Sequence, residues 1–197
     1  MTAEITIRPA RPSDASDIAL LINVATHGGI ARGWAAEDEA GESYDPIEIG
    51  RLEVLRDDET FNWRNATMAD APAGEVAGML LGYREPQKGR PVPPDTAPFM
   101  VPLLELEAAA EGTWFISMLG VHIPWRGRGV GSRLLEAADG KRRATAAGGL
   151  SLIVEDVNAD ARRLYERHGF SVRTSRPMAR FPGSTAPGRD WLLMVKD

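Results

Sequence analysis

A chain of 197 residues, 43% of them hydrophobic and 26% charged, has the composition of a globular protein large enough for a sizeable core. It contains no cysteine, which excludes disulfides, thiolate metal sites and a cysteine nucleophile. A net charge of -5 argues against a nucleic-acid partner, and no apolar run approaches the ~20 residues that cross a membrane.

The N-terminal stretch Met1–Arg8 lacks the basic and apolar regions of a secretory signal, so we expect a cytoplasmic protein. Ile5–Ala10 predicts a first strand that ends among prolines. Ser13 is the expected N-cap of a following helix. The apolar face of that helix consists of Ile18, Leu21, Ile22 and Ala25.

The next stretch, Gly28–Ser43, is rich in glycine, alanine and acidic residues and predicts a loop that contains Trp34. Asp45 before Pro46 predicts the start of a second helix, with Glu48 spaced for a capping box. The apolar contacts of this helix are expected from Ile47, Leu52, Val54 and Leu55.

A hairpin and a proline-rich segment follow. Phe61–Met68 alternates apolar and polar residues, Ala71–Gly74 is typical of a turn, and Glu75–Tyr83 predicts the returning strand. Residues 85–102 carry many prolines and no periodicity, which predicts a loop. Leu103–Ala110 is composed of strong helix formers and predicts a short helix.

The apolar run Trp114–Ile123 predicts a buried central strand, and a helix is expected from Val130 to about Ala146. The remaining elements are predicted as a strand at Leu150–Glu155, a helix at Asn158–His168 closed by Gly169, and strands at Phe170–Thr174 and Trp191–Lys196.

The segment Arg126–Gly131 joins the central strand to its helix. Consecutive N–H groups at a helix N-terminus, with little side-chain bulk and two arginines, favour a phosphate or pyrophosphate ligand. Ser132 and Arg133 follow the last glycine, so the Walker motif does not match, and neither does the dinucleotide pattern Gly-x-Gly-x-x-Gly. A tight turn that needs glycine for its backbone is the alternative interpretation.

Arg126, Gly129 and Gly131 form Arg-x-x-Gly-x-Gly, which resembles the acyl-CoA pyrophosphate loop of the GNAT superfamily of N-acetyltransferases. Downstream, Asn158, Tyr165 and the pair Gly169-Phe170 resemble the second signature of that family. The resemblance extends over Trp114–Arg173, in the family's order and spacing.

The resemblance implies an α/β (α+β) fold with a mixed, mostly antiparallel central sheet that is flanked by helices and splayed at its central strand. It implies a single domain over 1–197, with an acyl-CoA-binding core at about 113–175 and a proline-rich insertion at about 85–102. Dimers are common in the family, so a homodimer is a further expectation.

The implied activity is transfer of an acetyl group from acetyl-CoA, the co-substrate, to a primary amine of a small molecule or peptide, without a metal. The absence of cysteine favours direct transfer in a ternary complex. Two alternatives remain: a non-catalytic module that binds or senses acyl-CoA, and a phosphate-binding domain for another nucleotide.

The resemblance also assigns roles to residues. Tyr165 would protonate the leaving thiolate, or is a core tyrosine. Asn158 would bind the pantetheine amides, or only cap its helix. The stretch Leu119–Val121 would polarise the thioester. The full expected set for acetyl-CoA is Leu119, Gly120, Val121, Arg126, Gly127, Arg128, Gly129, Val130, Gly131, Ser132, Asn158, Ala161, Leu164 and Tyr165.

The acceptor side is less defined. The region between the first two helices would line the acceptor pocket, which makes Trp34, Glu37 and Asp38 candidates to bind an amine. The alternative is a solvated acidic loop with one buried tryptophan. The candidates for the general base are His122, Glu75, Glu105, Glu107 and a chain of water molecules.

Overall fold

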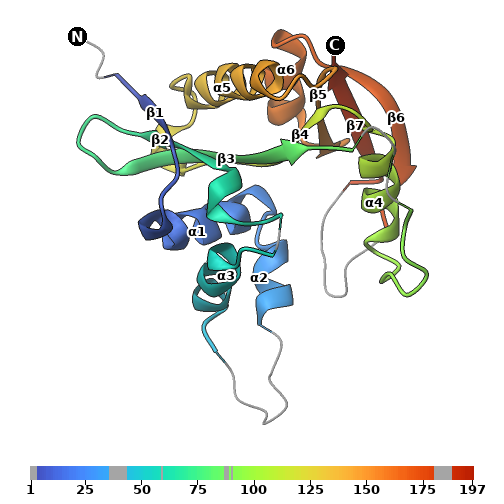
Figure 1. The fold of residues 1–197 in the computed structure, drawn as a ribbon, viewed down its shortest axis with the longest axis horizontal. Helices are drawn as coiled ribbons and strands as arrows, with labels where there is room; N and C mark the ends of the chain where they lie inside the picture. The colour runs from blue at the N-terminus through green and yellow to red at the C-terminus, as the bar shows by residue number, and fades with distance from the viewer. Residues whose placement is uncertain (1–3, 36–43, 59, 87–88, 90, 180–187) are drawn as a thin grey trace. The chain divides into compact units, whose positions relative to one another are not determined.

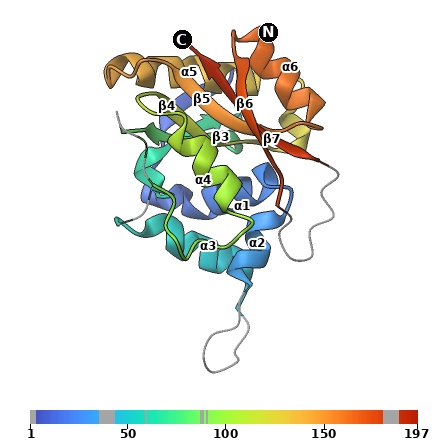
Figure 2. The ribbon, with the colours of Figure 1, turned by 90° about the vertical axis from the view of Figure 1, so that its right-hand side faces the viewer.

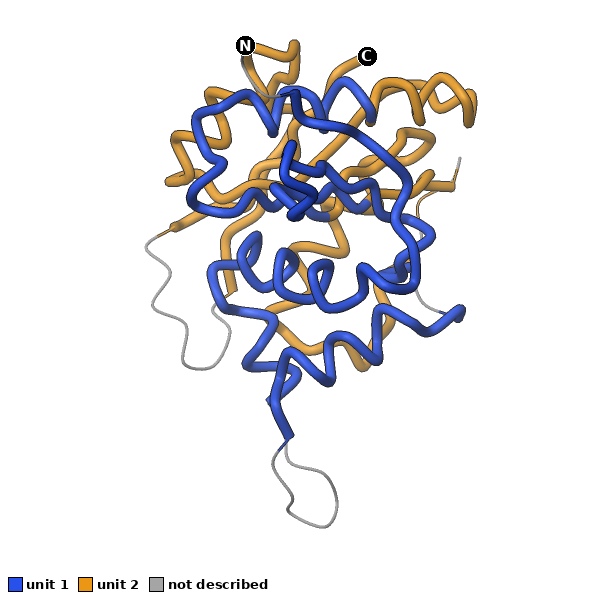
Figure 3. Tube along the Cα trace, turned by 90° about the vertical axis from the view of Figure 1, so that its left-hand side faces the viewer, with its two compact units in different colours: residues 1–81, 118–137 blue, residues 82–117, 138–197 orange. Residues whose placement is uncertain are grey.

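The computed structural model describes residues 4–35, 44–58, 60–86, 89, 91–179 and 188–197. The chain separates into two compact units, coloured in Figure 3: residues 1–81 with 118–137, and residues 82–117 with 138–197. Strands β3 and β4 and helix α5 each contribute residues to both units. This division leaves the single domain over 1–197 as a prediction.

An antiparallel meander opens the first unit. Strand β1 (Thr6–Pro9) pairs with β2 (Ala66–Asp70), and β2 pairs with β3 (Val76–Arg84). The turn at Ala71–Gly74 closes the β2–β3 hairpin, as the sequence predicted. The side chains that these strands bury completely are Met68, Met79, Leu80 and Leu81.

Helices α1 (Ala15–Ala25), α2 (Gly29–Trp34) and α3 (Pro46–Leu55) pack together in the first unit (Figure 1). The residues that α1 buries completely recur at helical spacing and include Ile18, Leu21 and Ile22. A Cβ added to Gly50 of α3 would lie 2.4 Å from the ring of Trp34, so α2 and α3 meet where only a glycine leaves room.

The predicted N-cap of α3 is confirmed. The Asp45 carboxylate accepts the backbone N–H groups of Ile47 at 2.9 Å and Glu48 at 3.1 Å. The Glu48 side chain binds Arg51 one turn along, which replaces the predicted capping box. Leu52, predicted to pack inward, is 50% exposed.

Three short helical segments differ from the prediction. A 3-10 helix at Pro12–Asp14 precedes α1, so Ser13 is not its N-cap. The predicted loop contains α2, and a 3-10 helix at Trp63–Asn65 replaces the first part of the predicted strand. In that segment the Asn62 side chain accepts the Arg64 N–H at 2.9 Å, and such local hydrogen bonds compete with strand pairing.

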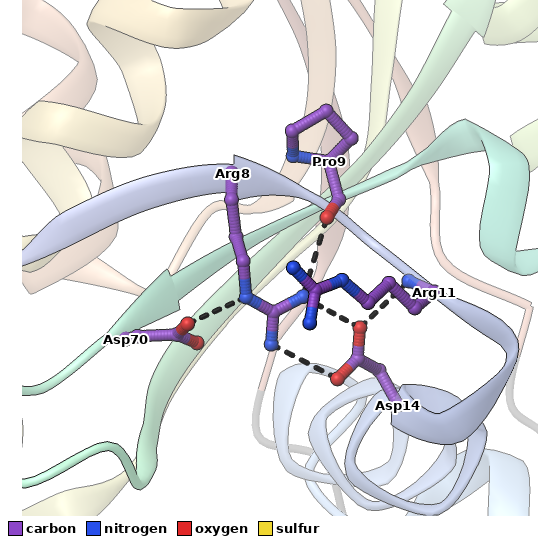
Figure 4. A network of polar contacts seen from close by, with 5 residues as sticks. All are labelled: Arg8, Pro9, Arg11, Asp14 and Asp70. Atoms are coloured by element: carbon purple, nitrogen blue, oxygen red, sulfur yellow. Dashed lines mark hydrogen bonds and ion pairs between the residues drawn. The ribbon is translucent and has the colours of Figure 1, made fainter.

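An ion-pair network connects β1, β2 and the start of α1 within the first unit (Figure 4). The Arg8 guanidinium donates to both oxygens of Asp14, at 2.7 and 2.9 Å, and through Nε to Asp70. Asp14 also accepts the Arg11 N–H at 2.7 Å. The hydrogen bond from Arg8 is the main cause that lowers the pKa of Asp14.

The second unit contains the strands β4 (Trp114–Val121) in part, β5 (Leu150–Glu155), β6 (Ser171–Pro177) and β7 (Asp190–Lys196). β5 runs parallel to β4 and antiparallel to β7, which pairs in turn with β6. Helix α6 (Ala159–Arg167) connects β5 to β6.

Helix α4 (Val101–Ala108) packs against β6 and β7 of the second unit (Figure 2). Its Leu106 is completely buried, in one cluster with Phe115 of β4 and Leu193 of β7. The helix therefore belongs to the folded core of this unit, although it follows a proline-rich segment.

Strand β4 has two irregularities. Its parallel pairing with β5 covers only Trp114–Ile116, while β5 continues to pair with β7 as far as Glu155. Hydrogen bonds join Glu85 to Thr113 and His122 to Ala77. The β4 stretch between these bonds is one residue longer than the β3 stretch, which indicates a β-bulge in β4.

Among the residues that the structure describes, seven strands have the order β1-β2-β3-β4-β5-β7-β6, with one parallel pair, β4–β5. The predicted fold class, a mixed, mostly antiparallel sheet flanked by helices and splayed at its central strand, is therefore confirmed. Among the described helices, none is long and apolar enough to cross a membrane.

Candidate functional site

The loop between β4 and α5 (Val130–Ala144) contains two glycines with positive φ. A 3-10 turn at Ile123–Trp125 leads into it. Gly127 has φ +70° and Gly129 has φ +81°, a region in which side-chain-bearing residues are strained. A Cβ at either position would meet nothing within 4 Å, so backbone conformation, and not crowding, requires glycine there.

The first turn of α5 follows directly. The initial N–H groups of a helix have no intrahelical acceptors and lie at the positive end of its dipole. Val130 is buried, and its Cγ1 would be 3.1 Å from a Cβ on Gly78 of β3, so the helix start is fixed against the sheet of the first unit. The stretch Gly127–Ser132 can therefore present consecutive N–H groups to an anion.

Two arginines flank this loop. Arg126 donates from Nε to the Val121 carbonyl at 3.0 Å, at the end of β4. The Arg128 guanidinium lies 5.1 Å from the ring centroid of Trp125, a cation–π distance. Both side chains are exposed, and both are held by neighbours within the loop region, so they add positive charge at defined places.

The end of β4 is closely covered by α1. A Cβ on Gly120 would lie 2.6 Å from the Leu21 carbonyl oxygen, so the glycine permits close approach of a helix backbone. The sequence had suggested either a bulge or a close backbone approach at this position. The neighbouring Leu119 and Val121 are half-buried, and all three belong to the first unit, together with the glycine-rich loop.

The second signature lies in the second unit. Asn158 is the N-cap of α6 and accepts the Ala161 N–H at 3.3 Å, so its predicted capping role is confirmed. Gly169 has φ +87° and ends the helix as predicted. Ala161 and Leu164 are half-buried positions on the same helix.

Tyr165 is 8% exposed, and its ring packs against Phe170 at a centroid distance of 5.9 Å. Burial raises the pKa of Tyr165 to about 12, so the hydroxyl keeps its proton at neutral pH. In the part of the chain that the structure describes, the hydroxyl has no hydrogen-bond partner. This differs from an ordinary core tyrosine, whose hydroxyl is bonded to another protein group.

Of the predicted acceptor residues, Trp34 is half-buried against Gly50. This contact agrees with the alternative of a buried tryptophan that packs α2 on α3. Glu37 and Asp38 lie outside the described residues, so their role stays a prediction.

The candidates for the general base lie in different surroundings. His122 is half-buried near Asp17 of α1. Burial raises the pKa of Asp17, although the charge of His122 acts in the opposite direction. Glu75 is exposed at the β2–β3 turn. Glu105 binds Arg176 at 2.6 Å, whereas Glu107 accepts a hydrogen bond from the Tyr83 hydroxyl at 2.6 Å.

Tyr83 was not among the residues singled out from the sequence. The alternation of β3 could have placed it on a sheet face, but nothing in the sequence pairs it with a helix 24 residues away. Arg8 was missed for the same reason, because its partner Asp70 is distant in the chain.

Comparison with known proteins identifies the family of the chain. The model of the acetyltransferase (GNAT) family matches residues 33–170, which is more than half of the chain. Comparison with curated proteins gave no match.

Several solved structures are similar over nearly the full length. A crystal structure of an acetyltransferase has a TM-score of 0.65 at 22% identity and covers 98% of both chains. An N-acetyltransferase from Staphylococcus aureus Mu50 has a TM-score of 0.65 at 17% identity, covering 96% of this chain and 99% of that one. The NatC complex bound to Gag peptide and CoA has a TM-score of 0.57 at 17% identity and covers 98% of both chains. These likenesses establish the fold, and the family match establishes the relationship: the chain belongs to the GNAT family of acetyltransferases.

Proposed function

We propose that this acetyltransferase moves an acetyl group from acetyl-CoA directly to a primary amine of a small molecule or peptide, in a ternary complex. The observation that carries the proposal is the loop at Arg126–Ser132. Its two glycines at positive φ, its helix N-terminus and its two arginines provide donors and charge suited to a pyrophosphate.

The pantetheine arm needs backbone partners, and β5 offers them. Within the described part of the chain, β4 pairs with β5 as far as Leu152, and the residues of β5 beyond it pair with β7 alone among the strands. Backbone groups on the other side of this stretch are therefore available to the amides of a ligand, as the family resemblance implies. The stretch Leu119–Val121 of β4 is proposed to donate to the thioester oxygen.

Tyr165 is proposed as the general acid. The amine nitrogen attacks the thioester carbon, the carbon–sulfur bond breaks, and the thiolate takes the proton of the Tyr165 hydroxyl. The acylated nitrogen loses its surplus proton to solvent, and solvent returns a proton to the tyrosinate. The raised pKa of Tyr165 supports this role in one respect, because the proton is present throughout the neutral range. Asn158 is proposed to orient the start of α6 and, through its side-chain N–H₂ group, to bind a pantetheine amide.

A non-catalytic acyl-CoA sensor is the second candidate. It would use the same loop but would have no need of a tyrosine hydroxyl that has no protein partner among the described residues. That hydroxyl favours the enzyme.

The test has two stages. Thermal-shift measurements with acetyl-CoA, CoA, ATP and NAD should show stabilisation by the two CoA compounds and none by NAD. CoA release from acetyl-CoA is then followed with a thiol-reactive dye in the presence of spermidine, an aminoglycoside, a lysine peptide and a peptide with a free N-terminus. Binding without amine-dependent release would favour the sensor, and no binding would overturn the proposal.

A further inference from the structure

In the second unit, a hydrogen bond joins the Tyr83 hydroxyl of β3 to the Glu107 carboxylate of α4 at 2.6 Å. The Tyr83 ring lies 5.8 Å from the ring of Phe115 on β4, in a tilted arrangement. The Ser117 hydroxyl, two residues further along β4, is near enough to Tyr83 to lower its pKa slightly against the other causes. A helix that follows the proline-rich segment therefore presents a carboxylate to the central strands of this unit.

The hydrogen bond is not what fixes α4 to the sheet. Leu106 and Ala110 are both completely buried in the cluster of Phe115, Leu193 and Val195. This apolar contact anchors the helix without help from Glu107, whose side chain is only half-buried. The charged group at this position is therefore not needed to anchor the helix.

A second feature indicates a ligand at the same cluster. The indole of Trp191 on β7 packs against it, as does the Tyr83 ring. Within the described ranges, the Trp191 Nε1 atom is buried and has no hydrogen-bond partner. A buried N–H donor without an acceptor is costly, so a bound molecule or water that accepts from it would relieve that cost.

The charges near this position are mainly negative. Burial, followed by the charge and hydrogen bond of Glu107 and the charge of Glu85, raises the pKa of Tyr83 well above its ordinary value. The phenol therefore stays protonated and donates to Glu107. Glu105, on the same helix, is paired with Arg176 at 2.6 Å.

We propose that Glu107, oriented by Tyr83, binds the ammonium group of the acceptor and takes its proton. The inference rests on the proposed acetyl transfer. One nitrogen–hydrogen bond of the ammonium group breaks, its electron pair stays on nitrogen and forms the new bond to the acetyl carbon, and the proton joins a Glu107 oxygen. The acylated nitrogen then loses a second proton to solvent, and Glu107 releases its proton to solvent after the transfer. Tyr83 is a positioning residue, since its hydroxyl fixes the carboxylate. The proposed thioester-binding stretch begins at Leu119, two residues after Ser117 in the sequence.

The chemistry narrows the acceptor class. The anionic oxygens of Glu107 favour a cationic amine over a neutral hydroxyl or amide. The aromatic side chains Tyr83, Phe115 and Trp191 gather at one cluster, which favours an apolar or aromatic group next to that amine. Glu107 is thus also a candidate determinant of acceptor choice.

The test compares Glu107→Gln with Glu111→Gln, which removes the same charge four residues further along. Glu111 is exposed and accepts the Gly89 N–H. CoA release is measured from pH 7 to pH 10 with the four amines named for the proposed function. We expect about a 100-fold loss of kcat/KM for Glu107→Gln at pH 7 and none for Glu111→Gln. The loss should shrink as pH rises, because the acceptor then arrives already deprotonated.

Two further measurements separate catalysis from folding. Acetyl-CoA should stabilise the Glu107→Gln variant against heat as much as the wild type. Tyr83→Phe should show a smaller loss, of about 10-fold, that also shrinks with pH. A Glu107→Gln enzyme that keeps wild-type rates, or a loss that is the same at every pH, would overturn the inference while leaving acetyl transfer intact. Wild-type protein that releases CoA with none of the amines would overturn the acetyl transfer itself.

Discussion

The Cα atom of Gly120 lies so close to the Leu21 carbonyl oxygen that a Cβ in this place would be 2.6 Å from it. The contact brings the backbone of α1 onto the end of β4, directly before the glycine-rich loop. Gly78 of β3 continues the close packing, since its Cβ would lie 2.8 Å from the Gly120 oxygen. Two glycines therefore determine how tightly this part of the first unit can pack.

We expect Gly120→Ala to lower the free energy of unfolding by about 1–3 kcal/mol, because the methyl group forces α1 away from β4. Urea unfolding followed by fluorescence measures the change. The control is Gly140→Ala in the interior of α5, where an added Cβ meets nothing within 4 Å. This variant should gain about 0.5–1 kcal/mol in the free energy of unfolding. Equal effects of the two substitutions would contradict the packing argument.

A second prediction concerns the proposed acid. Tyr165→Phe should lower kcat by about 100-fold while leaving acetyl-CoA binding unchanged. The hydroxyl has no partner among the described residues, so its removal should hardly change the thermal midpoint. Because the pKa of Tyr165 is raised to about 12, its ionisation should not cause any loss of activity below about pH 11. A wild-type kcat in the phenylalanine variant would exclude Tyr165 as the acid.

A third prediction separates backbone strain from ligand binding. Gly129→Ala and Gly74→Ala both place a methyl group on a residue with positive φ and open surroundings, at φ +81° and φ +96°. Each should cost about 1 kcal/mol of stability. Only Gly129→Ala, in the loop after β4, should also weaken acetyl-CoA binding, by about tenfold, which isothermal titration calorimetry can measure. If both weaken it equally, the loop is not the binding site.

The elements that the sequence predicted well are those with a local signal. Asp45 before Pro46, Asn158 at the start of α6 and Gly169 at its end all act through groups within a few residues. The strand Leu150–Glu155 was predicted at its observed bounds, because a continuous apolar run of this length is typical of a buried strand.

The features that the sequence missed depend on distant partners or on competing local bonds. The Tyr83–Glu107 and Arg8–Asp70 contacts join residues 24 and 62 positions apart, and no periodicity reports such pairs. The 3-10 helix at Trp63–Asn65 was missed because its alternating pattern suits a strand, while the Asn62 side chain stabilises a turn. The predicted roles in acetyl-CoA and acceptor binding remain predictions.

The last prediction concerns the network around Arg8. Asp14→Asn removes an ionised partner of the guanidinium and should lower the free energy of unfolding by about 2 kcal/mol at pH 7. The pKa of Asp14 is lowered in the folded protein, so its charge stabilises the fold above the ordinary value of 3.8. This stabilisation is lost as pH falls further, when the folded carboxylate is protonated. Urea midpoints of the wild type and the variant should therefore differ at pH 7 and converge toward pH 2.

The control for this prediction is Asp58→Asn, which removes the exposed partner of Arg56 at 3.0 Å and should leave the urea midpoint unchanged. Asp17 has a pKa shifted upward, mainly by burial, and therefore acts in the opposite direction. The charge of Asp14 contributes to that upward shift, so Asp14→Asn also lowers the pKa of Asp17, and this change offsets part of the destabilisation. A difference in urea midpoint that persists undiminished at pH 2 would show that Asp14 contributes through its packing and neutral hydrogen bonds, and not through its charge.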